Sequence, residues 1–193
     1  MTGRRLSDPR ELTALAHPVR IAIVEQLSLD GPLTATELAE RLDESPANCS
    51  WHLRKLAEHG FVEEAPSAGG RRRPWQMVQI GFSWKDADET PEGRRAALAL
   101  SELVLNRSLA RLREADERAA EEPREWREAS RSAQNMVWVT AEELGELNAE
   151  IAEVVLRFLG RFEDAAARPP GSRLCELVAW GVPTYIPGQE PTP

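Results

Sequence analysis

The chain has 193 residues, 41% of them hydrophobic, and its excess of Asp and Glu over Lys and Arg gives a formal net charge of −8. This length suffices for one or two domains with hydrophobic cores, and no apolar run approaches the length needed to cross a membrane. The polar beginning has no apolar stretch behind it, so we expect a soluble, cytoplasmic protein without a secretory signal. Cys49 and Cys175 lie in different regions and do not indicate a disulfide framework.

Two helices are expected at the beginning of the chain. Ser7 and Asp8 can cap the first, which carries Pro9 in its first turn. Its buried face is expected to comprise Leu12, Leu15 and Ala16. Pro18 starts a second helix that is apolar on most sides, as is typical of a helix packed between neighbours. His17 lies at their junction and is interpreted as structural, because no second His or acid stands at metal-ligand spacing.

A pair of short helices follows. Residues 34–42, TATELAERL, carry an apolar stripe of Leu38, Ala39 and Leu42. A second helix is bracketed by Ser45 as its cap and Gly60 as its stop. Its packing side is expected to comprise Cys49, Leu53 and Leu56, and its remaining surface is polar and partly basic. Two short helices joined by a few residues, the second with a free polar face, predict a helix-turn-helix.

A β-hairpin is expected next. Residues 61–65 form the first strand, 66–70 the turn, and 71–80 the return strand, which we expect to re-enter the core. The core side of the return strand is expected to comprise Trp75, Met77, Val78 and Ile80. Arg71, Arg72 and Arg73 would form a compact positive patch at the tip. A helix-turn-helix followed by a basic hairpin predicts a winged helix, a mainly α fold with a small β-wing.

Three motifs in this order resemble the ArsR-type winged-helix bacterial transcriptional regulators. They are AHPVR at 16–20, SWHL at 50–53, and GFV at 60–62, and the resemblance covers 7–80. It implies that the helix carrying Asn48 to Lys55 enters the DNA major groove and that the hairpin reaches the flanking backbone or minor groove. In this family the position of Cys49 is usually aliphatic, so we interpret Cys49 as a small packing residue rather than a redox sensor.

Side chains along this helix and hairpin suit contacts with double-stranded DNA. Asn48 offers its amide to a base edge, Ser50 can meet a base or a phosphate, and Trp51 offers an apolar face to thymine methyls. We therefore expect the DNA-binding residues to be Ser45, Asn48, Ser50, Trp51, His52, Arg54, Lys55, Arg71, Arg72 and Arg73. The alternatives are a merely solvated helix face and, for His52, packing inside the domain.

The charge distribution is compatible with a DNA partner despite the acidic total. Residues 45–80 carry a formal charge of +2, whereas residues from Gly81 onward carry −7. The acid is therefore concentrated outside the DNA-reading part, although that part is only mildly basic.

A long helix is expected after the hairpin. Thr90-Pro91-Glu92 starts it, and it runs to about Ala119. Leucines at heptad spacing, with further apolar residues beside them, give this helix an apolar face that is wider than one small wing can cover. We expect homodimerisation through Leu98, Leu105, Leu109 and Leu112, and the alternative is packing within one chain. We accordingly divide the chain into a DNA-binding domain over 1–84 and a dimerisation and effector region over 85–193.

The remaining residues predict a helix between two short strands. Glu121-Glu122-Pro123 interrupts the long helix, and strands are expected over 136–139 and 174–180. Thr140 and Glu143 form a capping box for a helix expected to run past Phe162 and to end before Pro169.

No cofactor, metal or catalytic site is indicated. All three histidines precede Gly81, and no arrangement typical of an enzyme is recognisable, so we expect a protein that is not an enzyme. An organic effector pocket bordered by Trp84, Trp126, Trp138 or Trp180 is left open against the alternative of core or interface packing.

These patterns predict a sequence-specific regulator that binds a two-fold operator as a homodimer and represses transcription. The alternative is a winged-helix module that binds proteins through its acidic second half and has no specific DNA site.

Overall fold

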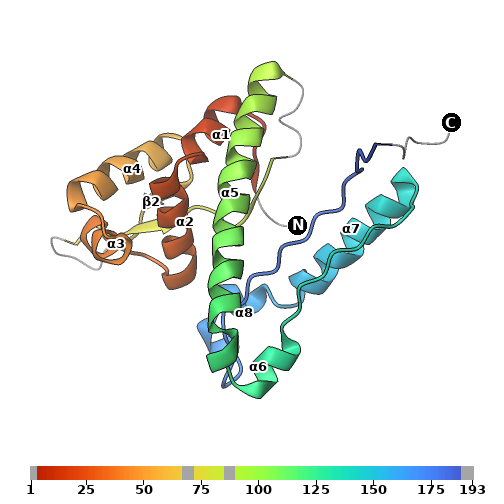
Figure 1. Cartoon of the computed structure of the whole chain (residues 1–193). Coiled ribbons are helices and arrows are strands. Elements are labelled where there is room, and N and C mark those ends of the chain that lie inside the picture. Colours follow the sequence, from red (N-terminus) through yellow and green to blue (C-terminus); the bar gives the residue numbers. More distant parts are fainter. Residues whose placement is uncertain (1–3, 67–71, 85–89, 188–193) are drawn as a thin grey trace. The chain divides into compact units, whose positions relative to one another are not determined.

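A computed structural model of the chain describes residues 4–66, 72–84 and 90–187. The fold is mainly helical with a small β-wing, as predicted (Figure 1). The chain divides into an N-terminal unit that ends at Arg111 and a C-terminal unit that begins at Leu112. This boundary lies inside helix α5 (Pro91–Arg118), because the first turns of α5 belong to the N-terminal core. The compact units therefore divide later than the functional division that we placed after residue 84.

The first four helices begin where the sequence places their caps. They are α1 (Pro9–Leu15), α2 (Pro18–Asp30), α3 (Ala35–Leu42) and α4 (Pro46–Glu58). The Asp8 carboxylate accepts from the Arg10 amide at 2.9 Å, and the Ser45 hydroxyl accepts from the Asn48 amide at 3.1 Å. Each cap satisfies a backbone donor that the helix itself leaves without a partner.

The turn between α3 and α4 depends on one left-handed residue. Asp43 ends α3 at φ +53°, and its amide donates to the Ala39 carbonyl. Asp is among the few side chains that tolerate this backbone region. The connection is therefore tight enough to hold the two helices as a helix-turn-helix.

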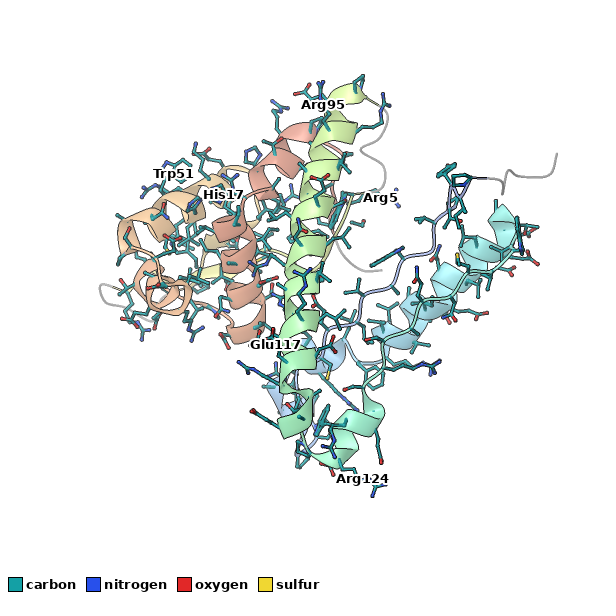
Figure 2. The ribbon with its side chains drawn as sticks, viewed as in Figure 1. Arg5, His17, Trp51, Arg95, Glu117 and Arg124 are labelled. Atoms are coloured by element: carbon teal, nitrogen blue, oxygen red, sulfur yellow. The ribbon has the colours of Figure 1, made fainter. Side chains whose placement is uncertain are left out.

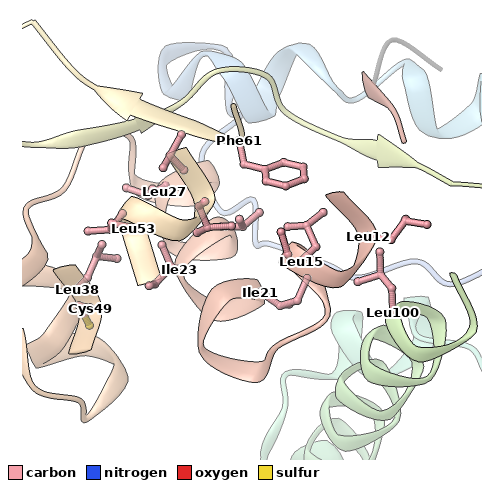
Figure 3. Close-up of a cluster of buried hydrophobic side chains, with 14 of the residues drawn as sticks. Leu12, Leu15, Ile21, Ile23, Leu27, Leu38, Cys49, Leu53, Phe61 and Leu100 are labelled. Atoms are coloured by element: carbon pink, nitrogen blue, oxygen red, sulfur yellow. The ribbon is translucent and has the colours of Figure 1, made fainter. Parts of the chain in front are cut away.

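The core of the N-terminal unit gathers side chains from every helix of that unit and from the start of the wing (Figure 3). Its fully buried members include Leu12, Leu15, Ile23, Leu38, Cys49, Leu53, Leu56, Phe61 and Leu100. Leu100 comes from α5, so this helix packs one face on the winged helix. The burial of Cys49 confirms its interpretation as a packing residue, and burial also raises the pKa of its thiol.

The wing is a short antiparallel pair, β2 (Val62–Glu64) with β3 (Trp75–Met77). Leu33 and Trp75 add a bridge through backbone hydrogen bonds of 3.0 and 2.7 Å. The expected return strand over 71–80 was too long, because the chain bends away after Met77 and leaves Val78 and Ile80 exposed. The expected turn and Arg71 lie outside the described residues.

A second strand pair was not predicted. Strand β1 (Arg4–Arg5) runs parallel to β4 (Phe82–Ser83). Two-residue strands, one of them two arginines, have no hydrophobic period that sequence reasoning could detect. Arg4 donates to the Gly60 carbonyl at 2.9 Å and lies over the Phe61 ring, so the N-terminal segment is fixed to the end of α4.

The C-terminal unit contains short elements around one longer helix. They are η2 (Ala119–Glu121), α6 (Arg124–Ala129), α7 (Ala141–Leu156), α8 (Gly160–Glu163) and η3 (Ala165–Ala167). The capping box of Thr140 and Glu143 is confirmed at the start of α7. The prediction that this helix continues past Phe162 was wrong: it ends at Leu156 in tighter i−3 turns before Gly160, a poor helix former.

The strands expected over 136–139 and 174–180 are absent, and the described residues there form no ladder. An isolated two-stranded pair without a covering layer is marginally stable, and no such layer forms within this unit. The returning chain instead reaches α7 at Gly181, whose carbonyl accepts from the side-chain Nδ2 of Asn148 at 3.3 Å. A Cβ at Gly181 would stand 2.7 Å from the Asn148 Oδ1, so any other residue there would have to displace the Asn148 side chain.

Within the described ranges, no helix has both the length and the apolarity that a membrane span requires.

Replacing the fully buried Leu53 by Ala should lower the free energy of unfolding by about 2–5 kcal/mol, because it leaves a cavity between α4 and its neighbours. Val78→Ala, at an exposed position of the wing, is the matched control and should change stability by less than about 0.5 kcal/mol. Urea denaturation followed by circular dichroism measures both. Equal effects would contradict the assignment of Leu53 to the core.

Candidate nucleic-acid interface

Helix α4 presents its polar side to solvent because its apolar side is locked into the core. Cys49, Leu53 and Leu56 are fully buried, and α4 packs on α2 and α3. The Ser45 hydroxyl accepts the capping hydrogen bond, so the clearest role of Ser45 is to position the first turn of α4. The predicted contact residues on the following turns are thereby carried on a rigid element.

Asn48 lies on this first turn and is held by a residue that sequence reasoning missed. Its Nδ2 donates to the Glu44 carboxylate at 2.8 Å. This bond uses one N–H of the amide and leaves the second N–H and Oδ1 available, the donor and acceptor pair that suits an adenine edge. The i, i+4 spacing of Glu44 and Asn48 is the signal in the sequence, but it spans the helix start, where Glu44 precedes the first helical residue.

The outer face of α4 carries three further predicted contact residues on successive turns. Trp51 is 46% exposed, which is unusual for so large an apolar ring, and Figure 2 shows it on the outward side of α4. Arg54 donates to the Ser50 hydroxyl at 3.0 Å. An apolar ring beside a guanidinium and a hydroxyl can meet the methyl, edge and phosphate groups of a duplex.

The prediction that His52 contacts DNA was wrong. Its side chain is only 3% exposed, and its ring lies 4.6 Å from that of His17 and 4.8 Å from that of Trp51. The alternative of packing inside the domain is therefore confirmed. His52 connects α4 to the start of α2 and supports Trp51 from behind.

His17 is structural, as interpreted from the sequence. Its Nδ1 accepts from the Val19 amide at 3.2 Å and so caps α2. Burial lowers the pKa of both His17 and His52, and Arg20 lowers both further. The His52 Nδ1 has no hydrogen-bond partner in the described structure. Both rings are accordingly held neutral at neutral pH.

The wing places arginines beside α4. Arg73 lies 4.0 Å from Glu64, and Arg72 pairs with Glu37 of α3. A concavity of about 400 Å³ opens between these elements, and its lining comprises Ala35, Ser50, Arg54, Glu64, Arg73 and Trp75. Two guanidinium groups on the rim of one hollow make it suitable for a phosphate.

Carboxylates inside the domain already engage most of these basic groups. Lys55 pairs with Glu58 at 2.8 Å, in addition to the pairs that Arg72 and Arg73 make. The Lys55 ammonium lowers the pKa of Glu58, and the Thr34 amide and hydroxyl lower the pKa of Glu37. Both acids therefore stay charged at neutral pH. A phosphate that approached Lys55 or Arg72 would have to displace Glu58 or Glu37.

The remaining predictions from the sequence concern metal and effector binding. In the ranges that the structure covers, no three His, Cys, Asp or Glu side chains are arranged to hold a metal ion. Trp84 donates to Ser101 at 2.9 Å, and Trp126 stacks under Arg173 at 4.8 Å. Trp138 and Trp180 are exposed. The organic effector pocket stays a prediction.

The part of the chain that forms the helix-turn-helix and the first strand of the wing matches a known protein family. Residues 15–65 match the family described as a helix-turn-helix domain, from the end of α1 to strand β2. Together with the hairpin that follows, this match defines a winged helix-turn-helix DNA-binding domain. No curated protein matches the chain.

Several solved structures of bacterial proteins show a partial likeness to this chain. The transcriptional regulator Tm0710 of Thermotoga maritima is 13% identical over 77% of this chain and 80% of its own, with a TM-score of 0.31. The MarR family regulator NMB1585 of Neisseria meningitidis is 17% identical over 74% and 78%, with a TM-score of 0.33. The Mycobacterium tuberculosis MarR family protein Rv2887, in complex with salicylic acid, is 21% identical over 77% and 87%, at 0.29. Such scores do not establish a shared overall fold.

Lowering the pH from about 7.5 to 5.5 should destabilise the N-terminal unit. The pKa of His17 and His52 is lower in the folded state, so the unfolded chain binds more protons and stability falls as the pH drops below the ordinary histidine value. Glu37 and Glu143, whose pKa is lowered, titrate below this window.

Urea titrations at the two pH values measure the effect, and His52→Leu is the comparison. We expect the variant to lose less stability on acidification than the wild-type protein, since only His17 remains of the pair. The same loss in both proteins would contradict a role for His52 in this pH dependence.

Proposed function

We propose that this DNA-binding transcriptional regulator recognises a specific duplex sequence through α4 and grips the flanking backbone through its wing. The observation that carries the proposal is the arrangement of Asn48, Trp51 and Arg54 on the exposed face of α4 beside Arg72 and Arg73. Base-reading and phosphate-binding groups thus lie on adjacent elements, as recognition of a duplex requires.

The proposed reading mechanism begins at the first turn of α4. With the helix in the major groove, the amide of Asn48, steadied by Glu44, would read a base edge, and Trp51 would contact thymine methyls. Arg54 and Lys55 would meet phosphates on the sides of the groove. Arg72, Arg73 and Arg71, which lies outside the described residues, would hold the neighbouring backbone.

We assign the regulator to the ArsR type and propose that it acts in the cytoplasm as a repressor. The motif AHPVR at 16–20 supports the type, because in this chain His17 caps α2 and its ring packs on His52 of the recognition helix. Repression is the simplest outcome for such a protein, since occupancy of a promoter is enough to exclude polymerase.

We further propose that the protein binds a two-fold operator as a homodimer. Leu98, Leu105, Leu109 and Leu112 are 43–60% exposed along one side of α5, and this supports a partner there. The two winged helices of the dimer would then reach half-sites one helical turn of DNA apart, about 34 Å. An organic effector could act on such a dimer, and its binding residues are not assigned.

Charge on the wing should determine affinity without determining sequence preference. The double variant Arg72→Ala/Arg73→Ala should weaken binding to all duplexes alike, because up to two phosphate contacts are lost. The slope of the logarithm of the binding constant against the logarithm of the salt concentration should fall in magnitude by about 1–2. Arg124→Ala/Arg127→Ala on α6 removes the same charge and should leave binding unchanged. Gel retardation over a range of salt concentrations measures both.

Asn48 should determine sequence preference. Selection of bound duplexes from a random library gives the preferred site of the wild-type protein, and Asn48→Ala should relax the preference at one base pair with a loss of about 1–3 kcal/mol. Glu44→Ala should cause a smaller relaxation at the same base pair, whereas Glu44→Gln, which still accepts from Asn48, should retain the preference. A different affected base pair for the two residues would contradict their pairing.

The alternative function is a winged helix that binds proteins and has no specific DNA site. The proposed function is supported if the protein still retards a selected duplex in the presence of competitor DNA and if this binding weakens steeply as the salt concentration rises. Failure to enrich any duplex would overturn it in favour of the alternative.

A further inference from the structure

The C-terminal unit has no core of its own. None of its described residues is buried, although it contains the long helix α7 and many large apolar side chains. Trp138, Trp180 and Tyr185 are each more than two-thirds exposed. Each such ring could bury roughly 150–250 Å² of surface in an interface. The unit therefore exposes more apolar surface than is usual for an isolated domain.

The exposed apolar residues of α7 form one continuous stripe. Leu147, Ile151, Val154 and Phe158, the last just beyond the helix end, are 41–52% exposed and follow each other at intervals of four, three and four residues. This spacing is that of the a and d positions of a heptad, which place knobs along one seam. The returning chain at Gly181 lies against Leu144 and Asn148 and leaves this stripe uncovered.

Helix α5 carries a second stripe of the same kind. Leu98, Leu105, Leu109 and Leu112 follow at intervals of seven, four and three residues, again the a and d spacing of a heptad. The stripe extends over about 21 Å and that of α7 over about 17 Å, at 1.5 Å per residue. The two seams therefore match in spacing and nearly in length.

The opposite side of α5 is already occupied. Ala96, Ala97 and Leu100 are buried in the N-terminal core, and Arg107 and Arg111 both pair with Glu25 of α2. These contacts fix which side of α5 is left for a partner. The leucine stripe is that side.

The charges of the two helices are complementary. Residues 141–156 of α7 contain five Glu and no Lys or Arg. Helix α5 contains six Arg, four Glu and one Asp over its full length, and residues 91–113, which carry the leucine stripe, contain five of these Arg and two of the Glu. A pairing of α7 with α7 would bring two strongly negative helices together, whereas a pairing of α7 with α5 sets the acidic helix against the arginine-rich part of α5.

We propose that α7 of one copy packs on the leucine stripe of α5 of a second copy, and that a two-fold axis repeats the contact. A second copy is the occupant because it supplies both faces in equal number. Each copy then contributes eight partly exposed apolar side chains, which suits the central part of a stable interface. This inference rests on the homodimer of the proposed function and assigns the partner of its leucine stripe, independently of any DNA site.

Cysteine cross-linking of the full chain tests the contact between copies. Chains with Leu105→Cys and chains with Ile151→Cys, in a Cys175→Ser background and with tags of different size, are co-expressed and oxidised. The neighbouring stripe positions Leu109 and Val154 form a second pair of variants, so that the result does not depend on one register. We expect a cross-linked product that contains both tags.

The proposal would be overturned if Leu105→Cys chains cross-linked only with each other, or if Ile151→Cys chains cross-linked only with each other. A chain that carries both cysteines gives a third test. An internal disulfide in this chain, without a doubling of its mass, would also overturn the proposal. Absence of any cross-link for both pairs in a protein that light scattering shows to be monomeric would also overturn it.

A charge reversal on α7 provides a second measurement without cysteine chemistry. Glu150 borders the stripe, whereas Glu153 lies further round the helix, so Glu150→Arg should raise the dimer dissociation constant about tenfold or more and Glu153→Arg, the matched control, should have a much smaller effect. Sedimentation in the absence of DNA measures both. If the protein forms the α5–α7 dimer but binds no specific DNA, this inference holds and the proposed function fails. If it binds DNA in a salt-sensitive way but forms no α5–α7 contact, only this inference fails.

Discussion

The structure depends on the burial of one side of α4. Three side chains of this helix, Cys49, Leu53 and Leu56, are withdrawn completely from solvent between α2 and α3. Because helix periodicity links the faces, fixing this side also fixes where Asn48, Trp51 and Arg54 point. The polar face is thus a consequence of the core, and its geometry is as rigid as the packing beneath it.

The electrostatics of the interface favour discrimination over adhesion. An overall charge of −8 and the internal pairs of Arg72, Arg73 and Lys55 with glutamates oppose general attraction to phosphate. In the proposed complex, a duplex would replace these partners with contacts of at least equal quality. Base-edge contacts on α4 would supply the difference, so a matched sequence would gain more than an arbitrary one.

Local signals made the N-terminal unit largely predictable. The caps at Asp8 and Ser45 and the helix periods each depend on residues a few positions apart, and these predictions were confirmed. The errors arose where distant residues decide the outcome. The inward orientation of His52 depends on His17, and the pairing of β1 with β4 joins segments nearly eighty residues apart.

The C-terminal unit was harder to predict for a related reason. Apolar runs such as 136–139 indicate strands only when a neighbouring strand and a covering layer are present. Here the runs are exposed, so their hydrophobicity carried information about a surface rather than about secondary structure. The candidate DNA-contact residues on α4 and the wing were proposed from sequence, whereas the carboxylates that hold Asn48 and Arg72, namely Glu44 and Glu37, required the structure.

The contrast between the two thiols has a practical consequence. Cys49 is sealed beneath the recognition helix, whereas Cys175 is open to solvent. An alkylating reagent would therefore label one sulfur at once and the other only when α4 lifts from its seat. The slow phase of labelling would report how often α4 opens at Cys49, from a thiol that the sequence already carries.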